Sequence, residues 1–225
     1  MIRSSGKKIL HLALPLILQQ LCLQMQLWID RAMLGHVNAA YFSAIGNASM
    51  PYHMVLSTIT AICGGTAILT AHSIGAGDRN RVKEVAESSF LGSSVLSLLA
   101  FGFFLFFSDE LFALMGVQPP ILEYSLSYIR ILSVSLIFMG ISSTATGILQ
   151  GLGFTRVIMA AGIAGNLLNI LLDRVLIFGV PGIPAMGIAG AALATVIANF
   201  LSALVLFVYV LRSRRMPVVL RMPRD

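Results

Sequence analysis

Six long runs of apolar residues dominate the 225-residue sequence, and each is long enough to cross a bilayer as a helix. A hydrocarbon core about 30 Å thick needs about 20 mostly apolar residues per helix. The predicted spans are 9–34, 52–74, 90–107, 124–149, 157–178 and 188–211. Between most of them lie clusters of glycine, proline and charged residues, which end helices. These clusters are 75–81, 108–120, 151–156 and 179–184.

Composition agrees with a membrane protein. The residues AVILMFWYC make up 57% of the chain and DEKR only 11%, whereas a soluble domain is typically about a quarter charged. A soluble enzyme, a disordered regulator and a secreted disulfide scaffold are therefore excluded. We expect an all-α integral membrane protein, a six-transmembrane-helix bundle in contact with the lipid bilayer. The formal charge of +6 does not predict a nucleic-acid partner, because its distribution follows the spans.

The positive charges predict the orientation of the chain. Twelve of the fifteen Lys and Arg residues precede the first span or follow the second, fourth and sixth. The connections after the first, third and fifth spans contain none. Since positive charge stays in the cytoplasm, both termini are predicted to be cytoplasmic. We expect the bundle over 1–211 and a basic cytoplasmic inter-lobe linker or tail over 212–225. The segment 39–50 is apolar too, and either lengthens the second helix or forms an interfacial piece.

Two carboxylates fall inside predicted spans, where an ionisable group is costly and is a functional candidate by default. Asp30 on the first helix shares a narrow polar stripe with Gln19 and Gln26. Asp173 on the fifth helix lies four positions after Asn169, so both are on one face. Because lipid offers these groups no partners, the two stripes are expected to face one interior space. Gly162 and Asn166 extend the stripe of the fifth helix.

Helix direction brings the two acids to the same depth. The first and fifth helices both run outward, and Thr195 lies early on the sixth helix as it returns. Two carboxylates, a carboxamide and a hydroxyl thus meet in the outer half of the bundle. Such an all-oxygen set suits H⁺ or Na⁺, because two adjacent carboxylates in a low dielectric cannot both ionise cheaply. Gln19, Gln26 and Asn166 are expected to line the cavity beside it.

A simpler interpretation treats both acids as interfacial. Arg31 and Arg174 directly follow them, so each pair could reach the outer headgroups by snorkelling. Consecutive helical residues point about 100° apart, so neither arginine is well placed to neutralise its neighbour. We favour arginines that anchor the helices and acids that function.

Signatures of enzymes and metal sites are missing from the sequence. The last histidine is His72, with no GxSxG motif, Walker loop or HExxH. Histidines at i, i+4 spacing and CxxC motifs are also absent. We therefore predict no catalytic residues, no cofactor, and no metal other than Na⁺ at the coupling site.

Several segments together resemble one transporter family. They are LALPLILQQL…LWIDRAMLG (12–35), GAGDRNR (75–81), YIRI (128–131), LQGLGFTRVIM…NLLNILLDRVLIFG (149–179) and PAMGIAGAALAT (184–195). In this order they resemble the amino-terminal half of a MATE (multidrug and toxic compound extrusion) transporter. The resemblance implies a cation-coupled antiporter, driven by H⁺ or Na⁺, that exports bulky and often cationic organic compounds across a bacterial-type inner membrane.

The resemblance also assigns roles to residues. It places the coupling-cation site of the amino-terminal lobe at Asp30, Asn169, Asp173 and Thr195. Family members hold their substrate between two six-helix lobes, so the resemblance implies that this chain works with a carboxy-terminal lobe or with a second copy. Arg31 and Arg174 stand where the family more often has neutral residues.

Two alternatives remain open at this point. One is a lipid-linked oligosaccharide flippase of the same superfamily, which would need several cationic residues in its cavity, and the predicted bundle offers three: Arg31, Arg130 and Arg174. The other is a transport-inactive fragment or assembly module.

Overall fold

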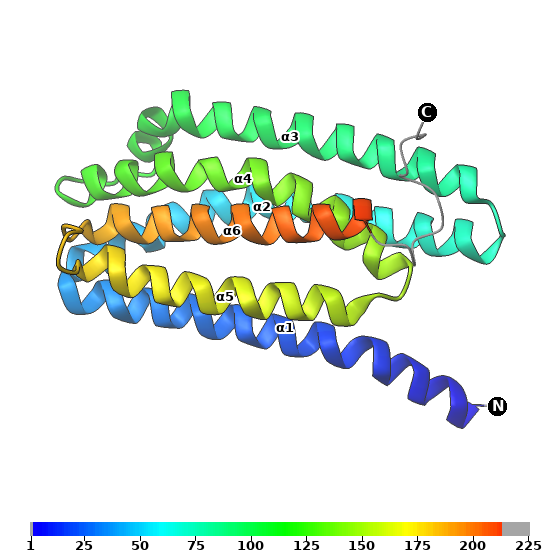
Figure 1. The fold of residues 1–225 in the computed structure, drawn as a ribbon. Coiled ribbons are helices and arrows are strands. Elements are labelled where there is room, and N and C mark those ends of the chain that lie inside the picture. Colours follow the sequence, from blue (N-terminus) through cyan, green and yellow to red (C-terminus); the bar gives the residue numbers. More distant parts are fainter. Residues whose placement is uncertain (1, 213–225) are drawn as a thin grey trace.

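Six helices make up the molecule. The computed structural model describes residues 2–212, with side chains from residue 13 onward. The helices are α1 (Ile2–Val37), α2 (Ala39–Gly75), α3 (Arg79–Leu114), α4 (Ile121–Gly151), α5 (Thr155–Phe178) and α6 (Gly187–Arg212). They lie along one another in an elongated bundle (Figure 1). The predicted all-α, six-helix fold is confirmed for this part of the chain. Except for Arg212, the predicted tail lies outside it.

The helices extend beyond the predicted spans. Hydropathy identifies only the apolar part of a helix, whereas the helix itself continues until a capping group ends it. The segment 39–50 belongs to α2, which settles the alternative left open by the sequence. Similarly, α3 begins in the charged segment before its apolar run, where the Asp78 side chain accepts a hydrogen bond from the Arg81 N–H at 2.9 Å.

A single residue, Asn38, joins α1 to α2. Its backbone is extended (φ −156°, ψ 125°), and its side chain accepts a hydrogen bond from the Ala40 N–H at 2.9 Å. Asparagine suits this position because its short side-chain oxygen satisfies an N–H that the helix leaves free. The sequence signal for this junction is an asparagine directly before the apolar run 39–50.

The centre of the bundle is α4, which packs on α2, α3 and α6. Buried side chains of α2, α3 and α4 form the largest apolar cluster, which includes Ile59, Phe104 and Leu136. Hydroxyl groups add hydrogen bonds between these helices, as in the 2.8 Å contact between Tyr52 on α2 and Ser135 on α4. Within lipid, close packing and such hydrogen bonds hold helices together.

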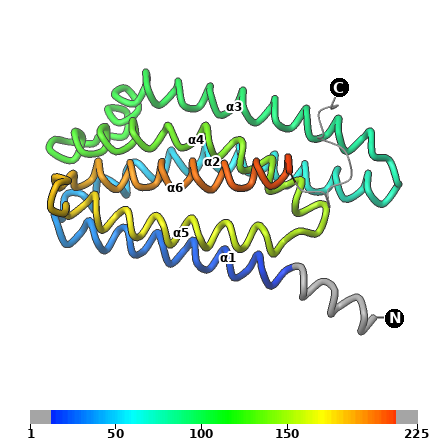
Figure 2. The backbone as a smooth tube through the Cα atoms, viewed as in Figure 1, coloured from blue at the N-terminus to red at the C-terminus, as the bar shows by residue number. Residues whose placement is uncertain are grey.

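On the other side of the molecule, α1 packs chiefly on α5, and α5 packs on α6. Figure 2 shows that α1 and α5 run in the same direction. At Gly190 on α6 the α5 backbone is so close that an added Cβ would lie 2.5 Å from the Leu176 carbonyl oxygen. This close approach brings Thr195, further along α6, near the polar face of α5.

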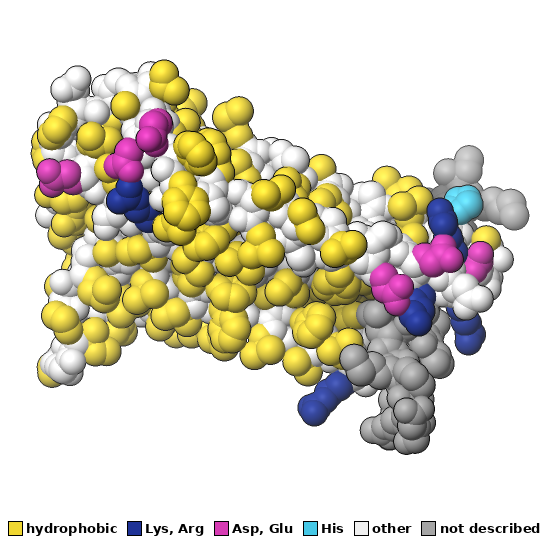
Figure 3. Space-filling model, turned by 90° about the horizontal axis from the view of Figure 1, so that it is seen from above, with side chains coloured by type: hydrophobic (Ala, Val, Ile, Leu, Met, Phe, Trp, Pro, Cys, Tyr) yellow, Lys and Arg dark blue, Asp and Glu magenta, His cyan; other side chains and the backbone are white. Residues whose placement is uncertain are grey.

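The surface is that of a membrane protein. Among the described residues, five helices are long and apolar enough to cross a bilayer, namely α2 to α6. In α1, four glutamines (Gln19, Gln20, Gln24 and Gln26) reduce the apolar character of the stretch whose side chains are described. Charged side chains gather at the two ends of the body, with an apolar belt between them (Figure 3). The first and last described residues lie at the same end (Figure 1), as an even number of spans requires.

Candidate functional site

Two parallel helices bring the predicted polar rows together. Gln26 and Asp30 on α1 face Asn169 and Asp173 on α5, and in each pair the residues are four positions apart. The Gln26 amide donates to the Asn169 side-chain oxygen and, at 3.5 Å, to Asp30 Oδ2. Asn169 and Asp173 are 1% and 0% exposed. The structure thus brings the two acids into one buried cluster, as the spacing predicted.

The two carboxyl groups lie close enough to interact with each other. Oδ1 of Asp30 and Oδ1 of Asp173 are both buried and have no hydrogen-bond partner among the described residues. A buried acceptor without a partner is costly, and two adjacent carboxylates repel each other. A single proton or small cation between them would relieve both costs.

Asn169 links this pair to α6. Its amide nitrogen donates to the Thr195 hydroxyl at 3.4 Å, and that hydroxyl donates to the Ala191 carbonyl at 3.1 Å. With the amide turned over, its nitrogen would instead donate to Asp173 Oδ2 at 3.2 Å and its oxygen would accept from the Thr195 N–H at 3.2 Å. Both orientations tie Asn169 to Thr195, so all four predicted cation-site residues belong to one cluster. Their role as a cation site stays a prediction.

A cavity of about 240 Å³ opens beside the cluster. Gln19, Gln26 and Asn166 line it, as predicted, together with Asp30, Asn169 and Thr195. In the amide orientation that satisfies its neighbours, Asn166 donates to Gln26 Oε1 at 2.8 Å. Gln26 is therefore central to the polar contact between α1 and α5, because it also donates hydrogen bonds to Asp30 and Asn169.

Several polar cavity residues were not predicted. They include Ser49, Tyr52, Tyr128, Asn199 and Ser202. Asn199 was detectable, because it lies four positions after Thr195 and so continues its face of α6. Tyr52 and Tyr128 lie near the ends of predicted spans, where tyrosine is also typical of the membrane interface, so the sequence carried no signal to separate the two roles.

The three arginines of the bundle have different surroundings. Arg130 on α4 pairs with Asp109 on α3, with both side chains partly exposed. Arg174 is exposed on α5. Arg31 lines both the cavity and a larger groove of about 620 Å³ between α1 and α2. Arg31 thus projects toward α2, and its role as a headgroup anchor stays a prediction.

Oxygen and amide groups make up the site, with no metal-ligand cluster near it. Among residues whose side chains are described, no three His, Cys, Asp or Glu side chains gather as a metal site would require. The two acids with Asn169 and Thr195 can hold a proton or a hard monovalent cation, for which oxygen ligands are suited. Long apolar helices around a buried polar cluster define a multi-pass membrane protein.

Comparison with known proteins identifies the family. A family model described as MatE matches residues 15–175, and the chain belongs to this family. A probable multidrug resistance protein NorM from Thermotoga maritima is 29% identical over 214 residues, covering 92% of this chain and 45% of that protein. The probable multidrug resistance protein YoeA from Bacillus subtilis is 32% identical over 167 residues, covering 74% of this chain and 36% of that protein.

Solved structures match the same fold. The outward-facing conformation of a multidrug resistance MATE family transporter of the MOP superfamily superimposes with a TM-score of 0.86 at 28% identity. The match covers 97% of this chain and 48% of that structure. The chain thus spans about half the length of the relatives it matches, or less, and its six helices correspond to one half of their fold.

Proposed function

We propose that this chain is one lobe of an exporter that moves bulky organic compounds out of the cell, coupled to inward movement of H⁺ or Na⁺. The observation that carries this proposal is the pair of facing carboxyl groups, Asp30 and Asp173, each with a buried oxygen that no described residue satisfies. The relatives described as multidrug resistance proteins support the export of organic compounds.

The coupling step follows from the position of α1. One side of this helix carries Asp30 in the cluster with α5, and another side lines the groove toward α2. A cation that binds from outside neutralises the pair and lets α1 and α5 approach, whereas its loss restores the repulsion. Because both sites share α1, the occupancy of one changes the shape of the other. Coupling between the cation site and the groove requires an element that belongs to both and has two positions, and α1 is that element.

Transport also needs a wall opposite the groove. We propose that a second six-helix lobe supplies it, either another copy of this chain or a carboxy-terminal lobe, since the relatives are about twice as long. Alternating access in transporters with internal repeats rocks one such half against the other. A flippase for a pyrophosphate-linked lipid is less well supported, because only Arg31 of the three bundle arginines lines the groove.

Cation binding can be measured on the purified chain in lipid nanodiscs. The thermal unfolding midpoint is recorded against Na⁺, with choline as the replacement cation, and separately against pH. A ligand that binds the folded state at a hundred times its Kd stabilises it by about 2.7 kcal/mol. We expect one of the two cations to raise the midpoint in the parent and in Asp109→Asn, whose acid is exposed, but not in Asp30→Asn. A parent that responds to neither cation, or an unchanged response in Asp30→Asn, would contradict the proposal.

Export itself is measured in proteoliposomes that contain the chain alone. Efflux driven by the cation gradient, and lost in Asp30→Asn, would identify a second copy as the opposing lobe. Cation binding without efflux would show that the chain does not transport alone, as expected if a different six-helix lobe is its partner. Efflux that persists in Asp30→Asn and ignores the gradient would remove the coupling assignment.

A further inference from the structure

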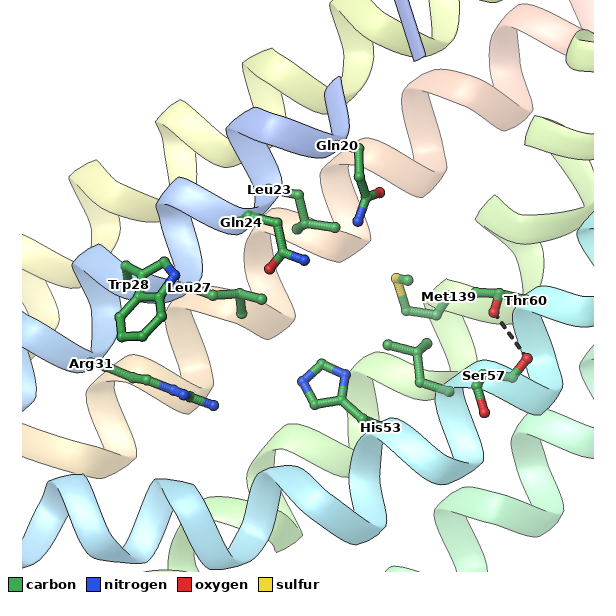
Figure 4. Close-up of a pocket in the computed structure, with 11 residues that line it drawn as sticks. Gln20, Leu23, Gln24, Leu27, Trp28, Arg31, His53, Ser57, Thr60 and Met139 are labelled. Carbon is green, nitrogen blue, oxygen red and sulfur yellow. Dashed lines mark hydrogen bonds between the residues drawn. The ribbon is translucent and has the colours of Figure 1, made fainter. Parts of the chain in front are cut away.

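The groove between α1 and α2 carries positive charge and no acid, which is unusual for a surface that would bind organic cations. Its α1 side carries Gln20, Gln24, Trp28 and Arg31, and its α2 side carries His53, Ser57 and Thr60. Figure 4 shows the Arg31 and His53 side chains projecting from opposite helices into the same space. Of the residues that line the groove, these two are the ones with ionisable side chains, and no acid is among them.

Arg31 has no acidic partner among the residues that line the groove. Of the residues whose side chains are described, none forms a salt bridge with it. Its neighbour Asp30 lies on another side of α1 and contacts Gln26 and Asp173. A guanidinium group in a membrane protein without a counter-charge is costly and marks a functional position. The groove thus presents one unmatched positive charge.

The remaining groups complete a site for a flat anion. The His53 imidazole offers an N–H donor in either protonation state, and the amides of Gln20 and Gln24 offer more. Trp28 is 67% exposed and its indole ring lies beside Arg31 along the groove (Figure 4). A volume of about 620 Å³ suits a drug-sized molecule.

We infer that this groove selects organic anions, namely aromatic compounds with one carboxylate or sulfonate, whose charged group sits between Arg31 and His53. The inference rests on the proposed export function and names the substrate class for it. It departs from the cationic compounds that the family resemblance implies. The guanidinium fork matches the geometry of a carboxylate or sulfonate, and Trp28 supplies a stacking surface for the aromatic body. A cation in the same place would meet the like charge of Arg31 with no acid in the groove lining to offset it.

Trp28 makes the inference directly measurable, because it is the single tryptophan of the chain. Pyrene accepts excitation energy from tryptophan, so a bound pyrene probe emits when Trp28 is excited. Two probes share this flat body and differ in the sign of charge, 1-pyrenesulfonate and 1-pyrenylmethyltrimethylammonium. Their affinities are measured with the purified chain in nanodiscs of zwitterionic lipid, with no cation gradient.

We expect the parent to bind the sulfonate more tightly than the ammonium probe. Arg31→Gln should weaken sulfonate binding by about tenfold or more, the loss typical of a removed charged hydrogen bond. Arg31→Lys keeps the charge and should retain most of the preference. The matched control is Arg174→Gln, which removes the same charge from an exposed position on α5 and should behave as the parent.

Partition of each probe into lipid is the same in all variants and cancels between them, and for the comparison of the two probes it is measured with nanodiscs that lack the chain and subtracted. Equal sulfonate affinities in Arg31→Gln and Arg174→Gln would overturn the inference, as would a parent that prefers the ammonium probe. Circular dichroism checks that each variant is folded. Since no gradient is used, a failure of coupled export would leave this result standing. Coupled export of the ammonium probe alone would overturn only the substrate class.

Discussion

Gln26 on α1 donates a hydrogen bond to Asn169 on α5, although the two residues stand 143 positions apart in the sequence. Each lies one helical turn before an acid, Asp30 on α1 and Asp173 on α5. The two helices therefore present matching rows, amide then carboxyl, at the same depth. This pairing fixes how far α1 is inserted relative to α5.

The coupling between the two amides can be measured with a double-mutant cycle. We expect Gln26→Ala and Asn169→Ala each to lower the free energy of unfolding, because each leaves a buried partner unsatisfied. The coupling energy between them should be about 0.6 kcal/mol and at most about 1.7, the range found for hydrogen bonds between membrane helices. Unfolding in mixed micelles gives the values. Strictly additive losses would show that the pair does not interact.

Replacement of one acid tests whether the pair is kept for stability. We expect Asp173→Asn to change the free energy of unfolding by less than about 1 kcal/mol in either direction, because it removes a repulsion as well as an acceptor. A carboxyl that served as half of a buried ion pair would cost about 3–5 kcal/mol when lost. The same micelle unfolding assay separates these outcomes. A loss in the larger range would indicate a structural role.

Close packing of α6 on α5 should tolerate no added methyl group at Gly190. A Cβ there would lie 2.5 Å from the Leu176 carbonyl oxygen, which belongs to the backbone and cannot rotate away. We expect Gly190→Ala to cost about 1–3 kcal/mol of unfolding free energy, as overpacking typically does. The control is Gly64→Ala on α2, where nothing lies within 4 Å of the added atom. It should be neutral or stabilising, since alanine favours helices.

The orientation of the chain can be tested by cysteine labelling. In a background with Cys22 and Cys63 changed to alanine, we expect a membrane-impermeant maleimide to label Val180→Cys in intact cells. Asn80→Cys, at the start of α3 near Arg79 and Arg81, should react only after permeabilisation, because positive charge stays inside. The reverse pattern would invert the topology.

Much of the fold was predictable from hydropathy and charge, because the bilayer imposes a length on every span. Apolar length located all six helices, and the basic residues predicted that the first and last described residues lie at one end. Helix ends were less accessible, as the charged start of α3 and the Asn38 junction show. There the helix is ended by caps and solvent rather than by lipid, and hydropathy does not measure those.

The site was predictable where helical periodicity was enough. Spacing of four placed Asn169 and Asp173 on one face, and the absence of partners in lipid placed Gln26 and Asp30 opposite them. Arg31 was not predictable in the same way, because its surroundings depend on the wide gap between α1 and α2. That gap results from which helices pack together, and no single stretch of sequence encodes it.

The one-residue junction at Asn38 would let α1 pivot about its carboxy-terminal end. With so short a tether, α1 is free to tilt about this point but not to slide along α2. At 1.5 Å per residue, Asp30 lies about 12 Å from this pivot. The amino-terminal end of the 36-residue helix lies about 50 Å from it. If α1 moves as a straight rod despite Pro15, a displacement of about 1 Å at Asp30 becomes about 4 Å at the amino-terminal end of the helix. Under the proposed coupling, a small displacement of Asp30 would be magnified into a larger one at the opposite end of α1.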